Sequence, residues 1–307
     1  MPKDYLDVLT AAVKSAKLSP SEIIVPEDCW VTLNGIRFHY LDWGNTHLPH
    51  LVLLHGGSLT AHTFDLAVLL LRDKYHCIAL SQRGHGDTEW TPEADREKNN
   101  QDLMLEDVRQ FIDYLDYDKL ALVGMSMGGL NAIRYASRYP EKLSHLGIVD
   151  VGPDAMTDGL IEMEQFRTNT QTLASFEDFL GQAVKFMPHR AVAHLEYSLT
   201  HSLKQQDDGS YTWKQDNRSP VSYIAEGEKK EANEARAALL WQDLESIKTP
   251  TCLFRGANTK IFSVQTMEKM MTVLDNVQAV EIPDATHNVH SDNPKRWAAE
   301  LNNFLKD

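Results

Sequence analysis

The segment Gly124–Gly129 places a serine where a nucleophile would be expected. It reads Gly-Met-Ser-Met-Gly-Gly, with Ser126 at its centre, an apolar run before it and a helix-like segment after it. A tight turn from a strand into a helix needs small residues at Gly124 and Gly128, and it holds the serine hydroxyl clear of the backbone. We therefore predict that Ser126 is a nucleophile, rather than a solvated serine in a glycine-rich turn.

Two backbone amides are candidates to stabilise the anion that serine attack creates. A tetrahedral intermediate needs donors aimed at its oxyanion. Met127, the residue after the serine, can supply one N–H group. The sequence His-Gly-Gly-Ser follows another apolar run, and Gly57 within it lets the backbone approach a substrate. We predict that Gly57 and Met127 form an oxyanion hole, with a plain strand-to-helix turn as the alternative, and that His55 is a structural residue rather than a base.

A serine nucleophile needs a general base from another part of the chain. Thirteen histidines compete for this role. His287 follows the last apolar run, which places it at the same sheet edge as Ser126. His290 lies three residues later, and such a pair can bind a metal ion, but no third ligand is apparent. We predict that His287 is the base, that no metal is bound, and that His290 is a neighbour of the site or a surface residue.

A serine and a histidine of this kind need a third residue, a carboxylate that orients the histidine, and this residue is the hardest to assign. The loop after residues 251–256 reads Ala-Asn-Thr-Lys and contains no acid. Asp150 ends the preceding apolar run, one strand beyond the nucleophile, and a carboxylate there can reach the imidazole of His287. We predict that Asp150 is the acid. The amide of Asn258 could orient the ring without charge. Asp284 and Asp292 flank His287, but they suit turn and capping roles better.

This chemistry needs a scaffold that brings distant segments to one edge. Short apolar runs alternate with helical segments along most of the chain. This alternation predicts an α/β fold, with a mostly parallel sheet covered by helices on both faces and with the strand ends along one edge. The predicted strands are 51–54, 76–80, 120–123, 146–149, 251–254 and 277–282. The predicted helices are 65–72, 103–115, 128–138, 264–274 and 294–305.

Two regions depart from the alternation. A helical period over Asp4–Ala16 ends at prolines and predicts an N-terminal helix, and a hairpin is expected around Asn34-Gly35. The stretch after Pro153 is helical in texture and too long for a structureless loop. The predicted division is a helical appendage at 1–28, a core at 29–154 and 248–307, and an inserted helical cap at 155–247.

The cap is expected to govern specificity. Its aromatic side chains and one methionine could line an apolar pocket, although most are expected in the cap's own core. Three histidines could meet a polar substrate group but are expected on the surface. The apolar residues are Phe166, Phe176, Phe179, Phe186, Met187, Trp213 and Trp241, and the histidines are His189, His194 and His201.

Composition limits the class of protein. The chain has 307 residues, 30 of them basic and 44 acidic, for a net charge of -14. This charge repels nucleic acid. Its three cysteines are widely spaced, which favours neither a disulfide framework nor a zinc site and predicts a reducing cytoplasm. No apolar run approaches the ~18 residues of a membrane helix, and the acidic N-terminus is unlike a signal peptide. We expect a soluble cytoplasmic protein with no nucleic-acid or membrane partner.

Taken together, the motifs resemble the α/β-hydrolase superfamily, and within it the lid-bearing, esterase-like serine hydrolases. The resemblance spans about residues 30–154 and 248–305. It implies that the acid missing from the loop after residue 256 comes from an earlier strand, because similar small esterases use an Asp-x-x-Pro segment, here Asp150 to Pro153. Ser81 replaces an aspartate that the family often has, which should affect loop structure. The matching segments are His55-Gly-Gly, Arg83-Gly-His-Gly-Asp87, Gly124–Gly129, Asp150-Val-Gly-Pro153 and His287–Pro294.

The resemblance implies hydrolysis of an ester-type bond in a small, apolar substrate through an acyl-enzyme, without a cofactor. A carboxylesterase or a lactonase fits, and a thioesterase is compatible. Two alternatives remain. One is hydrolysis of a carbon–carbon bond in a vinylogous diketone, and the other is a non-catalytic receptor for a small molecule. The Asp4–Ala16 helix could also serve as a docking or homodimer arm.

Overall fold

A computed structural model describes residues 4–306 of the chain except 97, 99, 217 and 219–225. Its centre is an eight-stranded sheet, counted over those residues, in the order β1-β2-β4-β3-β5-β6-β10-β11. Strands β1 and β2 form an antiparallel hairpin, β2 pairs antiparallel with β4, and all the other pairings are parallel. The strands are β1 (Glu27–Leu33), β2 (Ile36–Asp42), β3 (His50–Leu54), β4 (His76–Leu80), β5 (Leu120–Met125), β6 (Leu143–Val149), β10 (Thr251–Gly256) and β11 (Val277–Ile282).

The apolar runs form these strands because both faces of the sheet are buried. In β3, Leu51 and Leu53 belong to one apolar cluster, whereas Val52 and Leu54 belong to the other. Successive side chains of a strand point to opposite faces, so the two clusters lie on opposite sides of the sheet. This arrangement confirms the predicted α/β fold with helices on both faces.

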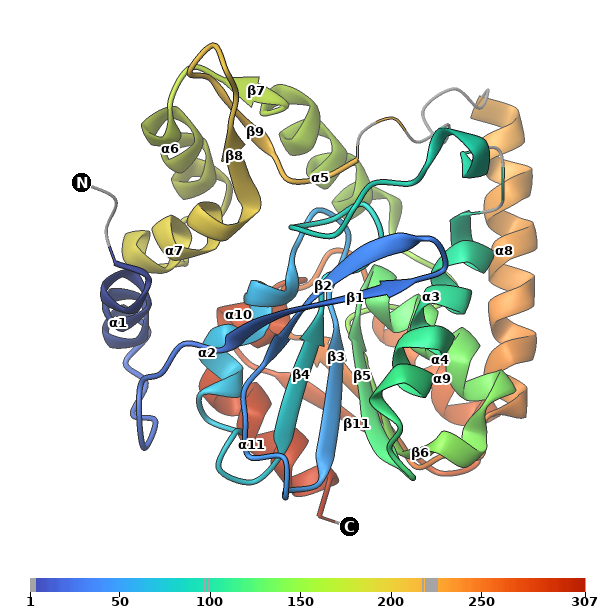
Figure 1. The fold of residues 1–307 in the computed structure, drawn as a ribbon. Helices are drawn as coiled ribbons and strands as arrows, with labels where there is room; N and C mark the ends of the chain where they lie inside the picture. The colour runs from blue at the N-terminus through green and yellow to red at the C-terminus, as the bar shows by residue number, and fades with distance from the viewer. Residues whose placement is uncertain (1–3, 97, 99, 217, 219–225, 307) are drawn as a thin grey trace.

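Helices from different parts of the chain cover the two faces (Figure 1). One cluster contains buried residues of α1, α2, α10 and α11, and the other contains residues of α3, α4, α8 and α9. Helix α2 is shorter than the predicted 65–72. The helices are α1 (Tyr5–Ser15), α2 (Asp65–Val68), α3 (Asn100–Leu115), α4 (Met127–Arg138), α8 (Glu226–Ser246), α9 (Val264–Val273), α10 (Val289–Asp292) and α11 (Pro294–Phe304).

A helical region is inserted after β6 and sits above the sheet (Figure 1). It has a small apolar cluster of its own, centred on Phe179 and Leu195. Its three short strands pair in the order β7-β9-β8. Its elements are α5 (Thr157–Asn169), β7 (Thr172–Leu173), α6 (Phe176–Phe186), α7 (Val192–Ser202), β8 (Leu203–Gln205) and β9 (Tyr211–Trp213).

Two helices at the borders of the predicted domains pack across those borders. Leu240 and Leu244 of α8 join the apolar cluster that also contains α4, so α8 runs beside the core (Figure 1). Helix α1 packs on α7, and Leu9 and Tyr197 share one apolar cluster. The division into appendage, core and cap therefore remains a prediction. Within the described residues, no helix is long and apolar enough to cross a membrane.

Candidate active site

Ser126 lies at the turn between β5 and α4, with φ 51° and ψ -118°. The turn is tight because its glycines leave no room for side chains. A Cβ at Gly124 would collide with the backbone of Gly128, and a Cβ at Gly128 would collide with the backbone of Leu54. The serine hydroxyl has no hydrogen-bond partner among the described residues. The strained turn thus presents a free hydroxyl, as the glycine spacing predicts.

Asp150 follows β6 directly and is fully buried. Backbone pairing places it near the serine turn, because Ser126 N donates to Val149 O at 3.0 Å. Its Oδ2 lies 2.8 Å from Nδ1 of His287. Since a carboxylate only accepts hydrogen bonds, we assign the Nδ1 proton to this contact, which leaves Nε2 of His287 as an acceptor.

The end of β10 and the loop after it hold the Asp150 carboxylate in place. Gly256 N donates to Oδ1 at 2.9 Å, and Thr259 Oγ1 donates to Oδ2 at 2.6 Å. This is the loop that lacks an acid in the sequence. It supplies the donor Thr259 to an acid from the neighbouring strand instead, and Gly256 at the end of β10 supplies the second donor. The sequence analysis missed both contacts. The only signal for Thr259 was its place in that loop.

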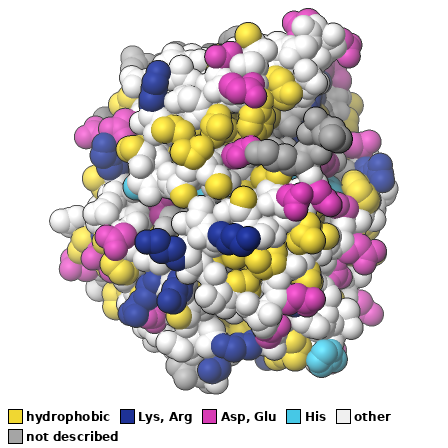
Figure 2. Space-filling view, turned by 90° about the vertical axis from the view of Figure 1, so that its left-hand side faces the viewer, with side chains coloured by type: hydrophobic (Ala, Val, Ile, Leu, Met, Phe, Trp, Pro, Cys, Tyr) yellow, Lys and Arg dark blue, Asp and Glu magenta, His cyan; other side chains and the backbone are white. Residues whose placement is uncertain are grey.

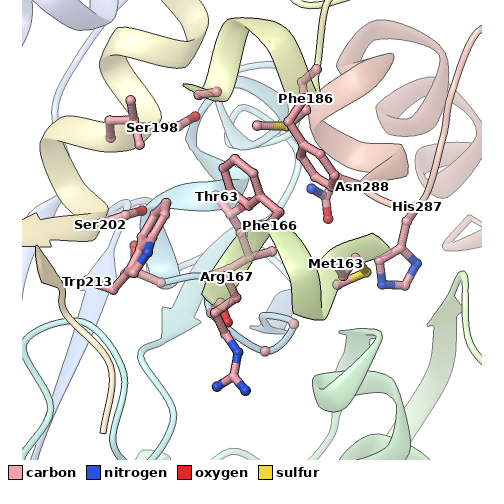
Figure 3. A pocket seen from close by; sticks show the side chains of 18 of the residues that line it. Thr63, Met163, Phe166, Arg167, Phe186, Ser198, Ser202, Trp213, His287 and Asn288 are labelled. Carbon is pink, nitrogen blue, oxygen red and sulfur yellow. The ribbon is translucent and has the colours of Figure 1, made fainter. Parts of the chain in front are cut away.

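One cavity contains Ser126 and His287 in its wall, together with Gly57 and Asn288. It encloses about 1010 Å³ when its open mouth is included. His287 comes from the loop after β11 and lies at one side of the cavity (Figure 3). The structure therefore brings Ser126, Asp150 and His287 to one sheet edge, although they are up to 161 positions apart in the sequence.

The amides of Gly57 and Met127 donate no hydrogen bond within the described residues. Gly57 lines the cavity, and the space where its Cβ would stand is open for 4 Å. Met127 is the first residue of α4, where N–H groups have no partner within the helix. It follows Ser126 directly, but it is not among the residues described as lining the cavity.

The histidines next to these motifs are buried and neutral. His55 Nδ1 lies 2.7 Å from Gly56 O and its Nε2 accepts from Gln82 N at 2.9 Å, which confirms a structural role. His290 is fully buried, with Nε2 2.9 Å from Thr63 Oγ1, so the expectation of a surface residue is wrong. Burial lowers the pKa of each imidazole to about 3, because desolvation disfavours the charged form.

The other candidate acids have different partners. Asp284 occupies a turn with φ 56° and is exposed. Asp292 accepts hydrogen bonds from Thr286 N and from Arg190 Nε, at 2.8 and 2.6 Å. Asn258, the candidate amide, donates its backbone N–H to Ala285 O at 2.8 Å.

Within the described residues, no group of three or more His, Cys, Asp or Glu side chains is arranged to hold a metal ion.

The Arg-Gly-His-Gly loop has a structural role. Arg83 makes two 2.7 Å hydrogen bonds to the buried Asp107 of α3. Ser81, where the family often has an aspartate, lies 3.1 Å from Nδ1 of His39 and 3.3 Å from the N–H of Ala61. Both side chains therefore shape the loops below the cavity.

The cap forms most of the cavity's apolar wall. Phe166, Phe186, Met187 and Trp213 line it, as the sequence allowed. Phe176 and Phe179 belong instead to the cap's own cluster. Of the three histidines expected on the surface, His194 is buried and His201 stacks on His62. The lining residues of the cap that the sequence analysis did not single out are Met163, Arg167, Ala183, Arg190, Leu195, Ser198, Leu199 and Ser202.

Comparison with known proteins defines the class. The model of the alpha/beta hydrolase fold family matches residues 49–294, which is well over half of the chain. The protein belongs to the α/β-hydrolase fold family.

Similar proteins include esterases. An esterase of Mycobacterium tuberculosis, Rv0045c, is 27% identical over 83% of this chain and 82% of its own length. A 3-hydroxybutyrate-oligomer hydrolase of Cupriavidus necator is 25% identical over 82% of this chain and 87% of its own. A solved structure of the Mycobacterium tuberculosis esterase has a TM-score of 0.76 at 24% identity and covers 100% of both chains, which supports the fold. The chain is thus a hydrolase-family member homologous to esterases.

Proposed function

We propose that the protein is a serine hydrolase that cleaves a carboxylic ester bond of a small, mainly apolar substrate. The observation that carries the proposal is the 2.8 Å contact between Asp150 and His287, at a cavity whose wall also contains the free hydroxyl of Ser126. An oriented imidazole beside a serine on a strained turn is the arrangement that activates an alcohol as a nucleophile. The esterase relatives support the same reaction class.

In the proposed reaction, Nε2 of His287 takes the Oγ proton as Ser126 attacks the ester carbonyl carbon. The amides of Gly57 and Met127 hold the oxyanion of the tetrahedral intermediate. His287 then returns the proton to the leaving alkoxide, and the acyl–oxygen bond breaks. Water repeats the sequence on the acyl-enzyme. Asp150 accepts the hydrogen bond from the Nδ1–H group throughout and stabilises the imidazolium. No step requires a metal or an organic cofactor.

Labelling with a fluorophosphonate tests the nucleophile. Ser126 Oγ should displace fluoride from phosphorus and form a stable phosphonate ester, which mass spectrometry locates at residue 126. The variant Ser126→Ala should lose the label and lose turnover by roughly 10⁴-fold or more. Ser58→Ala, which changes another serine of the cavity wall, should keep the label. A label at any other residue, or none on the wild type, would remove the serine-hydrolase proposal.

A substrate panel separates the ester reaction from its alternatives. p-Nitrophenyl esters of increasing acyl length should be hydrolysed, with a preference that reflects the apolar wall of Phe166, Phe186 and Trp213. Vinylogous diketones should be inert. Turnover of the diketones alone would favour carbon–carbon bond hydrolysis, and binding without any turnover or labelling would favour a receptor.

A further inference from the structure

The cavity has a polar patch on the wall formed by α7 and by the segment between β3 and α2. Thr60, His62, Ser198 and Ser202 line the cavity there. Ser198 and Ser202 are four residues apart on α7, so they share one face of the helix. Figure 3 shows both serines on the side of the cavity opposite His287. The hydroxyls of Thr60, Ser198 and Ser202 have no hydrogen-bond partner among the described residues.

His62 is held rigidly in this patch. Its Nδ1 lies 2.8 Å from Oδ2 of the fully buried Asp65. Its ring stacks on His201 with centroids 3.7 Å apart. Burial lowers the pKa of His62 to about 3, so the ring is neutral near pH 7. With the Nδ1 proton donated to Asp65, Nε2 is an acceptor.

No donor among the described residues forms a hydrogen bond with Nε2 of His62. His62 is only 8% exposed, yet its Nε2 has no hydrogen-bond partner there and is not among the nitrogens sealed from solvent. Because His62 lines the cavity, we infer that this nitrogen faces the cavity. A nearly buried, oriented acceptor without a partner indicates a place where a ligand donor binds.

Helix α1 supports this patch from behind. The hydroxyl of Tyr5 lies 3.1 Å from both Asp65 Oδ2 and His62 Nδ1. Tyr197 of α7 also donates to Asp65. Two tyrosine hydroxyls thus help to hold the carboxylate that orients His62, and one of them comes from the N-terminal helix. Tyr5 acts on a ligand only through Asp65 and His62, so it is a positioning residue.

The charges around the cavity favour a neutral ligand group. Both arginines that line the cavity are paired. Arg167 binds Glu164 with distances down to 2.7 Å, and Arg190 binds Asp292 at 2.6 Å. The patch itself offers three free hydroxyls and one imidazole acceptor. An alcohol matches this set, because a hydroxyl both donates and accepts a hydrogen bond.

We propose that Thr60, His62, Ser198 and Ser202 form a subsite for a hydroxyl group of the substrate, separated from the scissile carbonyl by an apolar chain. The inference rests on the proposed ester hydrolysis and narrows its substrate class to uncharged hydroxylated esters. Phe166 and Trp213 form the apolar wall of the cavity (Figure 3). The terminal hydroxyl of the substrate then donates to Nε2 of His62 and accepts from a serine.

Matched p-nitrophenyl esters test the subsite. For each acyl length from four to twelve carbons, the ester with a terminal hydroxyl is compared with its plain counterpart, and the readout is the ratio of their kcat/KM values. At one chain length the kcat/KM of the wild type should be about 10-fold or more higher for the hydroxylated ester than for the plain ester. The reason is that the plain ester leaves the polar groups of the subsite without hydrogen-bond partners. His62→Leu and Ser202→Ala should each lower this ratio toward 1.

A control on the same helix sharpens the result. Thr200→Ala changes an exposed hydroxyl of α7 that bonds to Glu196 O, and it should leave the ratio unchanged. Tyr5→Phe should raise KM for the hydroxylated ester with little effect on kcat, which a general loss of stability would not do.

The outcomes separate the two proposals. If Ser126 is labelled and plain esters are hydrolysed, but the wild-type ratio stays near 1 at every length, the subsite is wrong and the esterase proposal stands. If neither ester type is hydrolysed and Ser126 is not labelled, the esterase proposal fails first. A ratio that persists in His62→Leu would also overturn the subsite.

Discussion

Two carboxylate–imidazole pairs, each with a buried carboxylate, lie at the same cavity. Asp150 with His287 and Asp65 with His62 have the same residue types and the same 2.8 Å contact from Nδ1 to Oδ2. The difference lies in what surrounds them. The first pair stands at the sheet edge that carries Ser126, whereas the second stands among the free hydroxyls of α7. We propose that the first pair serves proton transfer and the second pair ligand recognition, although their residue types and contact are the same.

The donors to the two carboxylates also differ. Both oxygens of Asp150 accept hydrogen bonds, one from Gly256 N at the end of β10 and one from Thr259 Oγ1 in the loop that follows. The hydrogen bonds of Asp65 all go to Oδ2, and its buried Oδ1 has no partner among the described residues. An unpaired buried oxygen disfavours the charged form. We therefore predict different effects when each carboxylate is replaced by an amide. The change at Asp150 should affect turnover, and the change at Asp65 should affect the pH dependence of stability.

The largest expected effect comes from neutralising the first pair. Asp150→Asn should reduce turnover of p-nitrophenyl esters by about 10⁴-fold, because an amide no longer stabilises the imidazolium and can favour the wrong tautomer. Steady-state kinetics measures the loss, and circular dichroism checks that the fold remains. Asp284→Asn, an exposed turn residue that also flanks His287, is the matched control and should stay within twofold. Near-normal activity of Asp150→Asn would end its assignment as the acid.

Neutralising the second pair should change the pH dependence of stability. Burial raises the pKa of Asp65 to about 7, whereas an aspartate in the unfolded chain titrates near 3.9. The folded state therefore binds an extra proton between about pH 4 and 7, and stability from this group is lost as the pH rises through that window. Asp65→Asn should remove the loss, so its free energy of unfolding relative to wild type should increase by up to about 4 kcal/mol between pH 4 and 8.

Urea unfolding at several pH values provides this measurement. The buried histidines nearby, His62 and His201, are present in both proteins, so the difference between variant and wild type removes the part of their contribution that does not depend on Asp65. Asp292→Asn is the control. Burial alone would raise the pKa of Asp292, but Arg190, His189 and Thr286 together hold it below its usual range. Asp292 is thus ionised in both states above pH 5, so its own titration adds no slope to the difference from wild type between pH 5 and 8. A flat difference for Asp65→Asn would contradict the contrast between the pairs.

The smallest expected effect concerns the loop behind the first pair. Thr259→Val keeps the shape of the side chain but removes the hydroxyl that donates to Asp150 Oδ2. One hydrogen bond to a charged group is worth about 1.5–3 kcal/mol, so kcat should fall by roughly 10- to 100-fold. Thr259→Ser keeps the hydroxyl and should retain most of the activity. Equal losses in both variants would show that packing, rather than the hydrogen bond, matters at this position.

The face that carries α1 and the cap has apolar, basic and acidic side chains intermixed (Figure 2). Helix α1 buries Val8, Leu9, Ala12 and Val13, so its apolar stripe is already covered within this chain. The hypothesis that the helix is a docking or homodimer arm therefore needs a contact through its exposed side. Its observed contacts with α7, and Tyr5 behind Asp65, link it instead to the proposed subsite.

Much of the fold and part of the site could be predicted from local patterns. Apolar runs predicted each parallel strand, and the glycines around Ser126 predicted the tight turn, because steric limits act within a few residues. The absence of an acid after β10 directed attention to Asp150, which the structure places against His287. In contrast, the contribution of Thr259 had no local pattern, because a threonine donor looks like any other loop residue until the strand order places it beside Asp150.

The sequence by itself determined the alternation of strands and helices, the strained serine turn and the expectation that Ser126, His287 and Asp150 share one edge, since these depend on short-range sterics and on the rule that parallel strands end on the same side. Only the tertiary structure decided that Tyr5, His62, Asp65 and Tyr197 meet, and that His290 and His194 are buried. The contacts around His62 join α1, the segment from β3 into α2, and α7. Their positions depend on how whole layers pack rather than on any local pattern.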